Sequence, residues 1–490
     1  MSDFSDLGVG LSGLEAQQMG MNTVGQNVAN ANTPGYDDET VQLGAVGSAQ
    51  YAGTSPFAGD GVEVEGIERL TDSYLQQQSY TNQGAQGALS AQQDGLQAVQ
   101  EQFPEPSGNG ISSQLTQFWQ DWSTLANNPS DSSAQLTVVQ DGSTLAGSLN
   151  QTSAQLNTLS SQTVQNISTT LSQVNSEAQQ IASLNQSIMT GNGGSASGTG
   201  NTASLEDQRD QLISQLSNQL GLSVTYNSDG TANVYAGTEA LVSGSNYQQL
   251  SLSSSGPPYS LVWSNDQTTY QPTAGQLGGM LDVVNNYVPG YQQQLDQVAQ
   301  SLMGSVNYLM STGYDQAGNP GVAFFLGTGA GDIEVNPALV SNPSDIGANA
   351  SPTPAGSTAT NEDGTVAAEV GELPNSQTVT LAVPAGGWAD GSSASSWGTG
   401  STTATGPEAD AAYNQLVTGI GQATSSVNNQ LSDQQTITTN VNSALQAATG
   451  VNTDQELTNM VMYQNAYDAS AKFISTVDQI LQSIISMVNG

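Results

Sequence analysis

The chain has neither cysteine nor histidine among its 490 residues. Disulfides, thiolate nucleophiles and imidazole bases are therefore excluded, and most transition-metal sites lose their usual ligands. What remains for catalysis is a carboxylate pair or a carboxylate-bound metal, with Asp207 and Asp210 or Glu362 and Asp363 as candidates. We expect the first pair on a helix and the second in a loop, where exposure to solvent explains their acidic side chains without a catalytic role. We expect no catalytic, cofactor-binding or metal-binding residues, and no enzyme, because no nucleophile, base and stabiliser converge.

Basic side chains are also scarce. There are 3 Lys and Arg residues against 42 Asp and Glu residues, which gives a net charge of -39. Nucleic acid is excluded as a partner because its phosphates require clustered Lys and Arg, and anionic membrane surfaces are excluded for the same reason. Arg209 stands among acids, so we expect it to form a structural ion pair with Asp207 or Asp210.

The low charge has two open explanations. Charged residues make up 9% of the chain, and Gln, Ser, Thr and Asn replace them rather than a surplus of carboxylates. One hypothesis is that the protein works in an acidic medium, at a pH near or below the pKa values of its carboxylates. Most acids would then be protonated, and a protein with few basic residues would be nearly neutral. The alternative is lineage-wide drift in composition. A stability optimum at neutral pH would exclude the first explanation.

The first residues carry no export signal of the cleaved kind. Residues 1–6 have no basic group, and residues 7–28 are too polar for a signal-peptide core or a membrane span. If the protein is exported, it leaves by a route without a cleaved signal.

A helix stop at residues 28–36 is the most informative local pattern. Pro34 lacks an amide hydrogen and disfavours helix at the residue before it, and Gly35 readily adopts a positive φ. The residues of this join are Asn30, Asn32, Thr33, Pro34, Gly35 and Tyr36. We expect an amphipathic helix to end here and an extended segment to begin.

Apolar seams mark the helices expected at both ends of the chain. The N-terminal seam keeps a four-three spacing and comprises Leu7, Leu11, Leu14, Met21 and Val28. Two neighbouring stripes near the C-terminus include Leu457, Met460, Tyr467, Phe473, Ile474, Val477, Leu481, Ile484, Ile485 and Val488. So wide an apolar arc must be covered on more than one side, which favours packing between subunits. The alternative is a C-terminal helix buried within its own globular domain.

The chain as a whole is predicted to be mainly α, with a β-rich inserted middle. We expect residues 1–35 and 451–490 to pair as a coiled-coil-like terminal domain and residues 36–70 to form an extended arm or hairpin. The remaining expected domains are a helical bundle of residues 71–221 with 275–330 and 411–450, and a small outer β-rich domain of residues 222–274 with 331–410 that includes a low-complexity region. Six leucines and valines of residues 131–190 are predicted to face inward: Leu136, Val139, Leu145, Leu149, Leu156 and Leu159.

The N-terminal join resembles the signature of the flagellar axial proteins, which form the rod, the hook and the hook-associated proteins. Interior blocks resemble, more narrowly, the hook-associated protein 1 family. These blocks are residues 111–129, 205–221, 275–281, 295–299, Asn307, 313–315, 324–325 and 463–481. Departures concern charge, since the family commonly has basic residues near Gln135 and Asn285 and a histidine near Met310. The middle is also shorter than in larger members.

The resemblance implies a structural protein of the bacterial flagellum that forms a junction ring between hook and filament. It implies self-assembly through the terminal helices into a homo-oligomer, with hook protein and hook-associated protein 3 as neighbours. It further implies export by the flagellar type III apparatus to an extracellular place on the flagellum, with a cytoplasmic chaperone on the C-terminal helix. The alternatives are a hook or rod protein, or a secreted adhesin or surface-layer protein.

Overall fold

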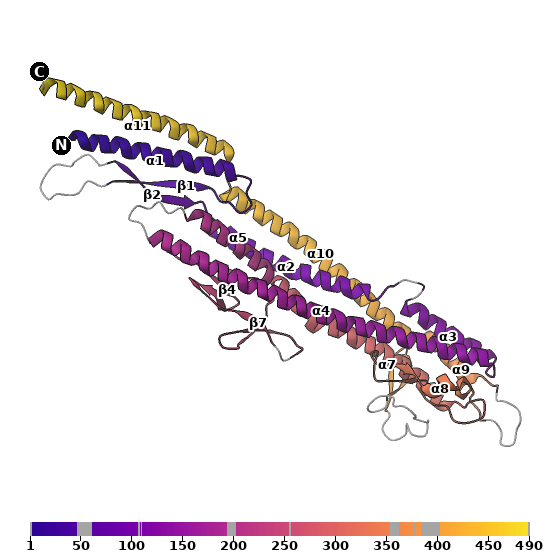
Figure 1. The fold of residues 1–490 in the computed structure, drawn as a ribbon. Coiled ribbons are helices and arrows are strands. Elements are labelled where there is room, and N and C mark those ends of the chain that lie inside the picture. The colour runs from indigo at the N-terminus through magenta and orange to yellow at the C-terminus, as the bar shows by residue number, and fades with distance from the viewer. Residues whose placement is uncertain are drawn as a thin grey trace.

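The computed structural model describes residues 2–46, 61–105, 108, 110–193, 202–253, 256–352, 362–376, 378–383 and 402–488. The molecule is a long rod of helices with small β-sheets along its side, and both ends of the chain lie at one end of it (Figure 1). The predicted fold class, mainly α with a β-rich middle, is confirmed.

The terminal end of the rod is a pair of antiparallel helices. Helix α1 (Ser2–Asn30) lies beside α11 (Thr453–Val488), and a hairpin of β1 (Glu39–Ala45) and β2 (Val62–Arg69) lies along α1 (Figure 1). The hairpin strands pair antiparallel, and Glu39 is opposite Arg69. We refer to α1 and α11 together as the terminal pair.

The rest of the rod, which we call the body, is built on long helices. Their bounds are α2 (Ser73–Glu101), α3 (Ile111–Asn127), α4 (Ser132–Gly193), α5 (Ala203–Leu220), α6 (Gly275–Asp282), α7 (Val288–Thr312) and α10 (Ala409–Thr449). Asp72 begins α2 by accepting hydrogen bonds from two backbone amides. Helix α4 alone runs for about 90 Å at 1.5 Å per residue.

An aromatic core fills the end of the body far from the terminal pair. Helix α3 supplies Leu115, Phe118, Trp119, Trp122 and Leu125, all buried as its helical spacing predicts. Phe324 and Phe325 pack on Phe118 with ring centroids 5.7 and 5.6 Å away. Five of the six predicted inward residues of α4 are buried or half-buried, but Leu136 is 44% exposed. That prediction was wrong for Leu136, because it lies nine positions before Leu145, which places it on the opposite face of the helix.

Short elements complete this first core. They are β10 (Phe325–Leu326), β11 (Glu334–Val335), α8 (Pro337–Ser341), α9 (Thr365–Gly371), β12 (Thr378–Val383), β13 (Thr402–Pro407) and two 3-10 turns (Pro343–Asp345 and Leu373–Asn375). Asn307 of α7 organises them, since its Oδ1 accepts from the amides of Phe324 and Phe325 at 2.7 and 3.0 Å.

A second core lies nearer the terminal pair, where two small sheets cover α4, α5 and α6. One sheet has the order β3 (Ser223–Tyr226), β4 (Ala232–Ala236), β5 (Glu239–Ser243), β6 (Asn246–Tyr247), and the other β7 (Leu250–Leu252), β8 (Leu261–Trp263), β9 (Thr269–Tyr270). Gly221 ends α5 at φ +68, and Gly230 forms the β3–β4 turn at φ +84. Both positions require glycine's freedom to adopt positive φ.

The grouping of residues 222–274 with 331–410 into one outer domain needs correction. Apolar side chains between 222 and 263 enter the second core, whereas those between 333 and 379 enter the first. The two segments therefore lie against different parts of the body, as β4 and β7 do relative to α8 and α9 in Figure 1. Residues 353–361, 377 and 384–401 of the low-complexity region lie outside the described residues.

Candidate assembly interface and hinge

The two helices of the terminal pair approach each other through small residues. A Cβ added to Gly10 would lie 2.5 Å from Cγ1 of Ile474, and one added to Gly20 would lie 2.6 Å from the ring of Tyr463. Contacts under 3.0 Å are not tolerated, so glycine at both positions allows the helices to touch. The buried residues of α1 are Gly10, Ala16, Gly20, Thr23, Val24 and Asn27.

The predicted N-terminal seam does not form this contact. Leu7, Leu11 and Val28 are exposed by 36%, 52% and 36%, and Leu14 and Met21 are half-buried. Helix α11 packs on Gly10 and Gly20 of α1, because small residues permit the closer approach. The role of the seam as an interface between subunits stays a prediction.

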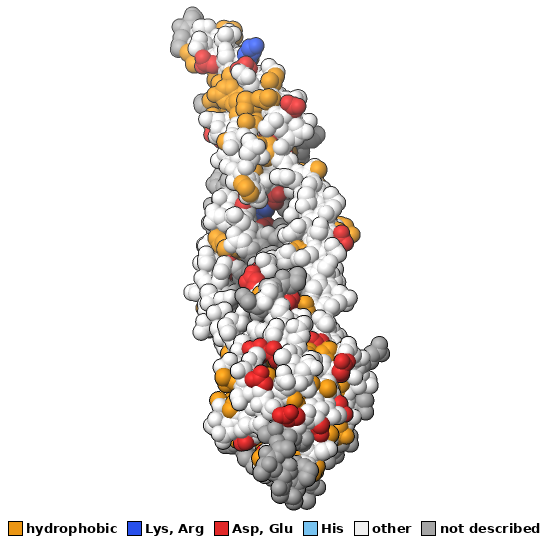
Figure 2. Space-filling model, turned by 90° about the vertical axis from the view of Figure 1, so that its right-hand side faces the viewer, with side chains coloured by type: hydrophobic (Ala, Val, Ile, Leu, Met, Phe, Trp, Pro, Cys, Tyr) orange, Lys and Arg blue, Asp and Glu red, His pale blue; other side chains and the backbone are white. Residues whose placement is uncertain are grey.

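The C-terminal seam is divided between covered and open positions. Of the predicted residues, Val477 is buried, and Met460, Tyr467, Ile474 and Leu481 are half-buried. The exposed ones are Leu457, Phe473, Ile484 and Ile485, with Val461, Met462 and Ile480 beside them. The side chain of Val488 lies outside the described residues. Figure 2 shows hydrophobic side chains gathered at the terminal end of this face of the molecule.

The predicted helix stop is present at the join. Helix α1 ends at Asn30, whose carbonyl accepts from the amide of Thr33 at 2.7 Å. The side chains of Asn30 and Thr33 also bond to each other at 3.2 Å. Gly35 adopts φ +79, in the left-handed region, and Asn32 and Pro34 are exposed. The chain reverses here into the hairpin.

Asn27 connects four segments at this point. Its Nδ2 donates to the carbonyl of Glu39 at 2.9 Å, to Oε2 of Glu456 at 2.8 Å and to Asp38. Its Oδ1 accepts from the Tyr36 hydroxyl at 2.9 Å and from the Glu39 amide at 3.1 Å. Sequence reasoning missed Asn27, although a single amide on the small-residue face of α1 was a usable signal.

Arg69 attaches the hairpin to the body. Its side chain is 3% exposed and forms ion pairs with Asp37 of the join and with three acids of α5. The nitrogen-to-oxygen distances are 2.8 Å to Asp207, 3.0 Å to Asp210 and 3.5 Å to Glu206. This residue was also missed, and its signal was its rarity, since it is one of 3 basic residues in the chain.

Acidic side chains outnumber basic ones around Asn27 and Arg69, and burial raises the pKa of several of these acids. Burial and the Glu456 charge raise the pKa of Asp38 to about 6. Burial also raises the pKa of Asp207 to about 7, although Arg69 acts in the opposite direction. Arg209 is buried nearby. Its Nε lies 2.9 Å from Oδ1 of Asp210, so the predicted local ion pair is present, and its guanidinium carbon lies 5.0 Å from the centre of the Tyr226 ring.

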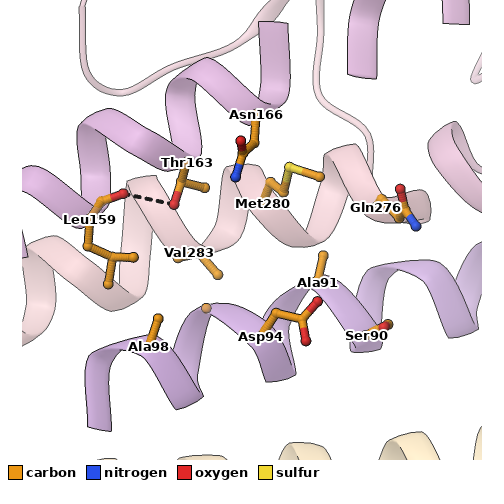
Figure 3. A pocket seen from close by; sticks show the side chains of 11 residues that line it. Ser90, Ala91, Asp94, Ala98, Leu159, Thr163, Asn166, Gln276, Met280 and Val283 are labelled. Carbon is orange, nitrogen blue, oxygen red and sulfur yellow. Dashed lines mark hydrogen bonds between the residues drawn. The ribbon is translucent and has the colours of Figure 1, made fainter. Parts of the chain in front are cut away.

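Two cavities adjoin these contacts. The first, of about 490 Å³, lies between the join and helices α2, α5 and α10. The second, of about 270 Å³, lies in the body where α2, α4 and α6 meet, and Figure 3 shows Ala91 and Asp94 of α2 across from Met280 and Val283. Val283 begins a π-helical stretch (Val283–Tyr287) between α6 and α7. The first cavity lies at the boundary between the join and the body, and the second lies inside the body.

No helix in the described part of the chain has the length and apolar character needed to cross a membrane. Among the same residues, no three acidic side chains cluster in a way that could hold a metal ion.

Comparisons with known proteins match most of this architecture. Residues 96–325 match the model of the flagellar hook-associated protein FlgK helical domain. Residues 7–36 match the flagella basal body rod protein model, and residues 441–487 match the C-terminal model of the basal body rod FlgEFG proteins.

Curated relatives match over long stretches. Flagellar hook-associated protein 1 of Bacillus subtilis (strain 168) is 26% identical over 99% of this chain and 98% of its own length. The protein of that name from Escherichia coli (strain K12) is 26% identical over 97% and 98%. The one from Salmonella typhimurium is 27% identical over 64% of this chain and 58% of its own.

A solved structure shares the fold. The flagellar hook junction protein FlgK from Burkholderia pseudomallei superposes with a TM-score of 0.58 at 18% identity, over 76% of this chain and 99% of that one. The terminal helices and the join thus define a structural component of the bacterial flagellum, of the class to which rod proteins belong. Within that class, the helical domain and the full-length relatives show that the chain belongs to the flagellar hook-associated protein 1 family.

Proposed function

We propose that this chain is a structural subunit of the junction between the flagellar hook and filament, and that it assembles with copies of itself through its terminal helices. The observation that carries the proposal is the division of apolar side chains in the terminal pair. Its two helices pack through glycines of α1, and Leu11, Val461 and Ile485 stay 52%, 58% and 58% exposed. Soluble monomers rarely leave such a surface uncovered, which favours neighbouring subunits as its cover.

The same proposal includes a ring of identical subunits between hook protein and hook-associated protein 3. It places the chain outside the cell on the flagellum, exported by the flagellar type III apparatus. A cytoplasmic chaperone holds the C-terminal helix before export, because exposed apolar stripes favour aggregation while they are unpaired. The proposed role is structural rather than enzymatic, as the names of the relatives indicate.

The join and Arg69 are proposed as the hinge between the terminal pair and the body. Pro34 and Gly35 allow the chain to turn. Asn27 limits the turn by bonding β1 to α11, and Arg69 limits it by bonding the join to α5 of the body. A subunit that connects a curved, flexible hook to a rigid filament needs this combination of a turn and a restraint.

Two alternatives remain distinguishable. A hook or rod protein would share the matches at residues 7–36 and 441–487, but the helical-domain match at 96–325 favours a hook-associated protein. A secreted adhesin or surface-layer protein would bind its surface through residues 71–440 and would not need the terminal helices.

Immunogold labelling of intact flagella tests the location, with gold expected at the boundary between hook and filament. Substituting Ile474→Asp or Leu481→Asp puts a charge into the half-buried seam of α11 and is expected to abolish that labelling, while circular dichroism shows a folded body. Normal filaments with labelled boundaries in either variant would refute the seam assignment. Labelling along the whole hook would favour the hook-protein alternative.

A further inference from the structure

The three basic side chains of this protein have different environments. Arg69 and Arg209 are 8% and 2% exposed and their guanidinium groups pair with acids of the same chain. Lys472 of α11 is exposed and forms no ion pair with any described residue. It is the one basic side chain left for a contact with another molecule.

Lys472 lies on the side of α11 that faces away from α1. It lies two positions before Ile474, which is a rotation of about 200° on an α-helix. Ile474 contacts Gly10 of α1, so Lys472 points to the opposite side. Val461 lies three turns away on nearly the same line and is 58% exposed. The lysine therefore stands on the uncovered face of the terminal pair.

Resting on the function proposed above, we propose that Lys472 binds Glu15 on α1 of a neighbouring copy of this chain. Charge complementarity points to such a contact, since each subunit carries a net charge of -39 and Lys472 is its one exposed basic side chain. Any other charged contact between copies would bring acid against acid, which is repulsive.

The geometry of the terminal pair selects Glu15. Identical subunits close into a ring through contacts between two different surfaces. In the proposed contact, α11 of one copy meets α1 of the next, and the ring axis runs along these helices, so positions keep the level that they have within one chain. Gly10 lies opposite Ile474 and Gly20 opposite Tyr463, which puts Glu15 level with residue 468. Lys472 is four residues away from that level, or about 6 Å along the axis, within reach of a lysine side chain. Glu15 is exposed, next to Leu11 on the uncovered seam.

The expected role of this pair is to set register. An apolar stripe allows neighbouring helices to slide in steps, whereas a charge pair at one level favours one alignment. An exposed ion pair changes an association constant by at most about fivefold, so apolar contacts supply most of the strength.

A charge swap in the full-length protein tests the pair directly. Lys472→Glu and Glu15→Lys are each expected to lower the amount of protein at the hook–filament boundary, measured by immunogold counts, by about fivefold. The double variant restores it. The matched control combines Lys472→Glu with Asp478→Lys, another exposed acid of the terminal pair, and restores nothing.

Cross-linking gives a second measurement, because the chain has no cysteine of its own. Lys472→Cys with Glu15→Cys is expected to give ladders of linked subunits when isolated flagella are treated with a short bismaleimide, because the axial offset between the two positions is too large for a direct disulfide. Lys472→Cys with Gln26→Cys, on an exposed site about three turns further along α1, gives none.

The inference is overturned if the swap does not rescue and no ladder forms while the variants still label the boundary, a result that leaves the proposed function intact. Cross-links to a different flagellar protein would also overturn it. Absence of the unmodified protein from the boundary would instead refute the proposed function.

Discussion

The two ends of this rod bury apolar side chains in different ways. At the far end, Phe118, Trp122 and Phe324 are fully enclosed within one chain. In the terminal pair, small residues make the contact, while Val461 and Ile485 remain 58% exposed. Helical apolar periodicity is present at both ends, so periodicity alone does not say which molecule covers a stripe. The far end is complete in one chain, and the terminal end is built to be completed by neighbours.

The largest expected effect is at the enclosed end. Trp122→Ala removes a fully buried indole that packs edge-on against Phe118 at 6.1 Å. We expect a loss of about 3–5 kcal/mol in the free energy of unfolding, measured by urea denaturation. Tyr74→Ala, at a side chain that is 74% exposed, serves as the control and should stay within about 0.5 kcal/mol. Equal losses would mean that the far end is not a packed core.

A smaller effect is expected inside the terminal pair. Gly20→Val forces side-chain atoms into the ring of Tyr463 and should weaken the contact of α1 with α11 by about 1–3 kcal/mol. Gly25→Ala on the same helix meets nothing within 4 Å and should stabilise α1 by roughly 0.5–1 kcal/mol. Amide hydrogen exchange in α11 measures both changes. Faster exchange in the alanine variant than in the valine variant would contradict the small-residue contact.

A gradual effect is expected from pH, at both ends. Burial is the main cause that raises the pKa of Asp38 and Asp121 to about 6, of Asp207 to about 7 and of Glu408 to about 8. The folded chain then holds protons that the unfolded chain releases near pH 4, so stability is highest near pH 4 and falls as pH rises toward 8.

Thermal unfolding between pH 3 and pH 9 measures this dependence. Glu408→Gln should flatten the curve between pH 5 and pH 8, because it removes the group with the highest of these pKa values. A stability maximum at neutral pH would contradict the titration argument and, with it, the hypothesis of an acidic medium.

Local signals in the sequence are enough to predict much of the fold. Asp72 begins a helix, Gly221 ends one, and residues 227–230 form the turn between β3 and β4. These features depend on a few neighbouring residues, so they can be read without the tertiary structure. The aromatic spacing of α3 likewise predicted its buried face.

Features that depend on distant contacts could not be predicted in the same way. Placing residues 333–379 in the first core requires knowing where α7 and α3 lie. Arg69 meets Asp207 and Asp210 across a separation of more than 130 residues, and nothing near Arg69 in sequence indicates this. The glycine face of α1 was overlooked because the leucine stripe is the stronger pattern, yet the close helix contact needs the weaker one.

The central claim is that the large apolar side chains of the terminal pair are held for neighbouring subunits. Ile485→Asp tests it most directly, with urea denaturation of the purified chain and gold labelling of flagella measured on the same variant. We predict an unfolding free energy within about 0.5 kcal/mol of the unmodified chain, because Ile485 is exposed, together with no labelling at the hook–filament boundary. A folded variant that labels the boundary normally, or one that unfolds as Trp122→Ala does, would contradict the claim.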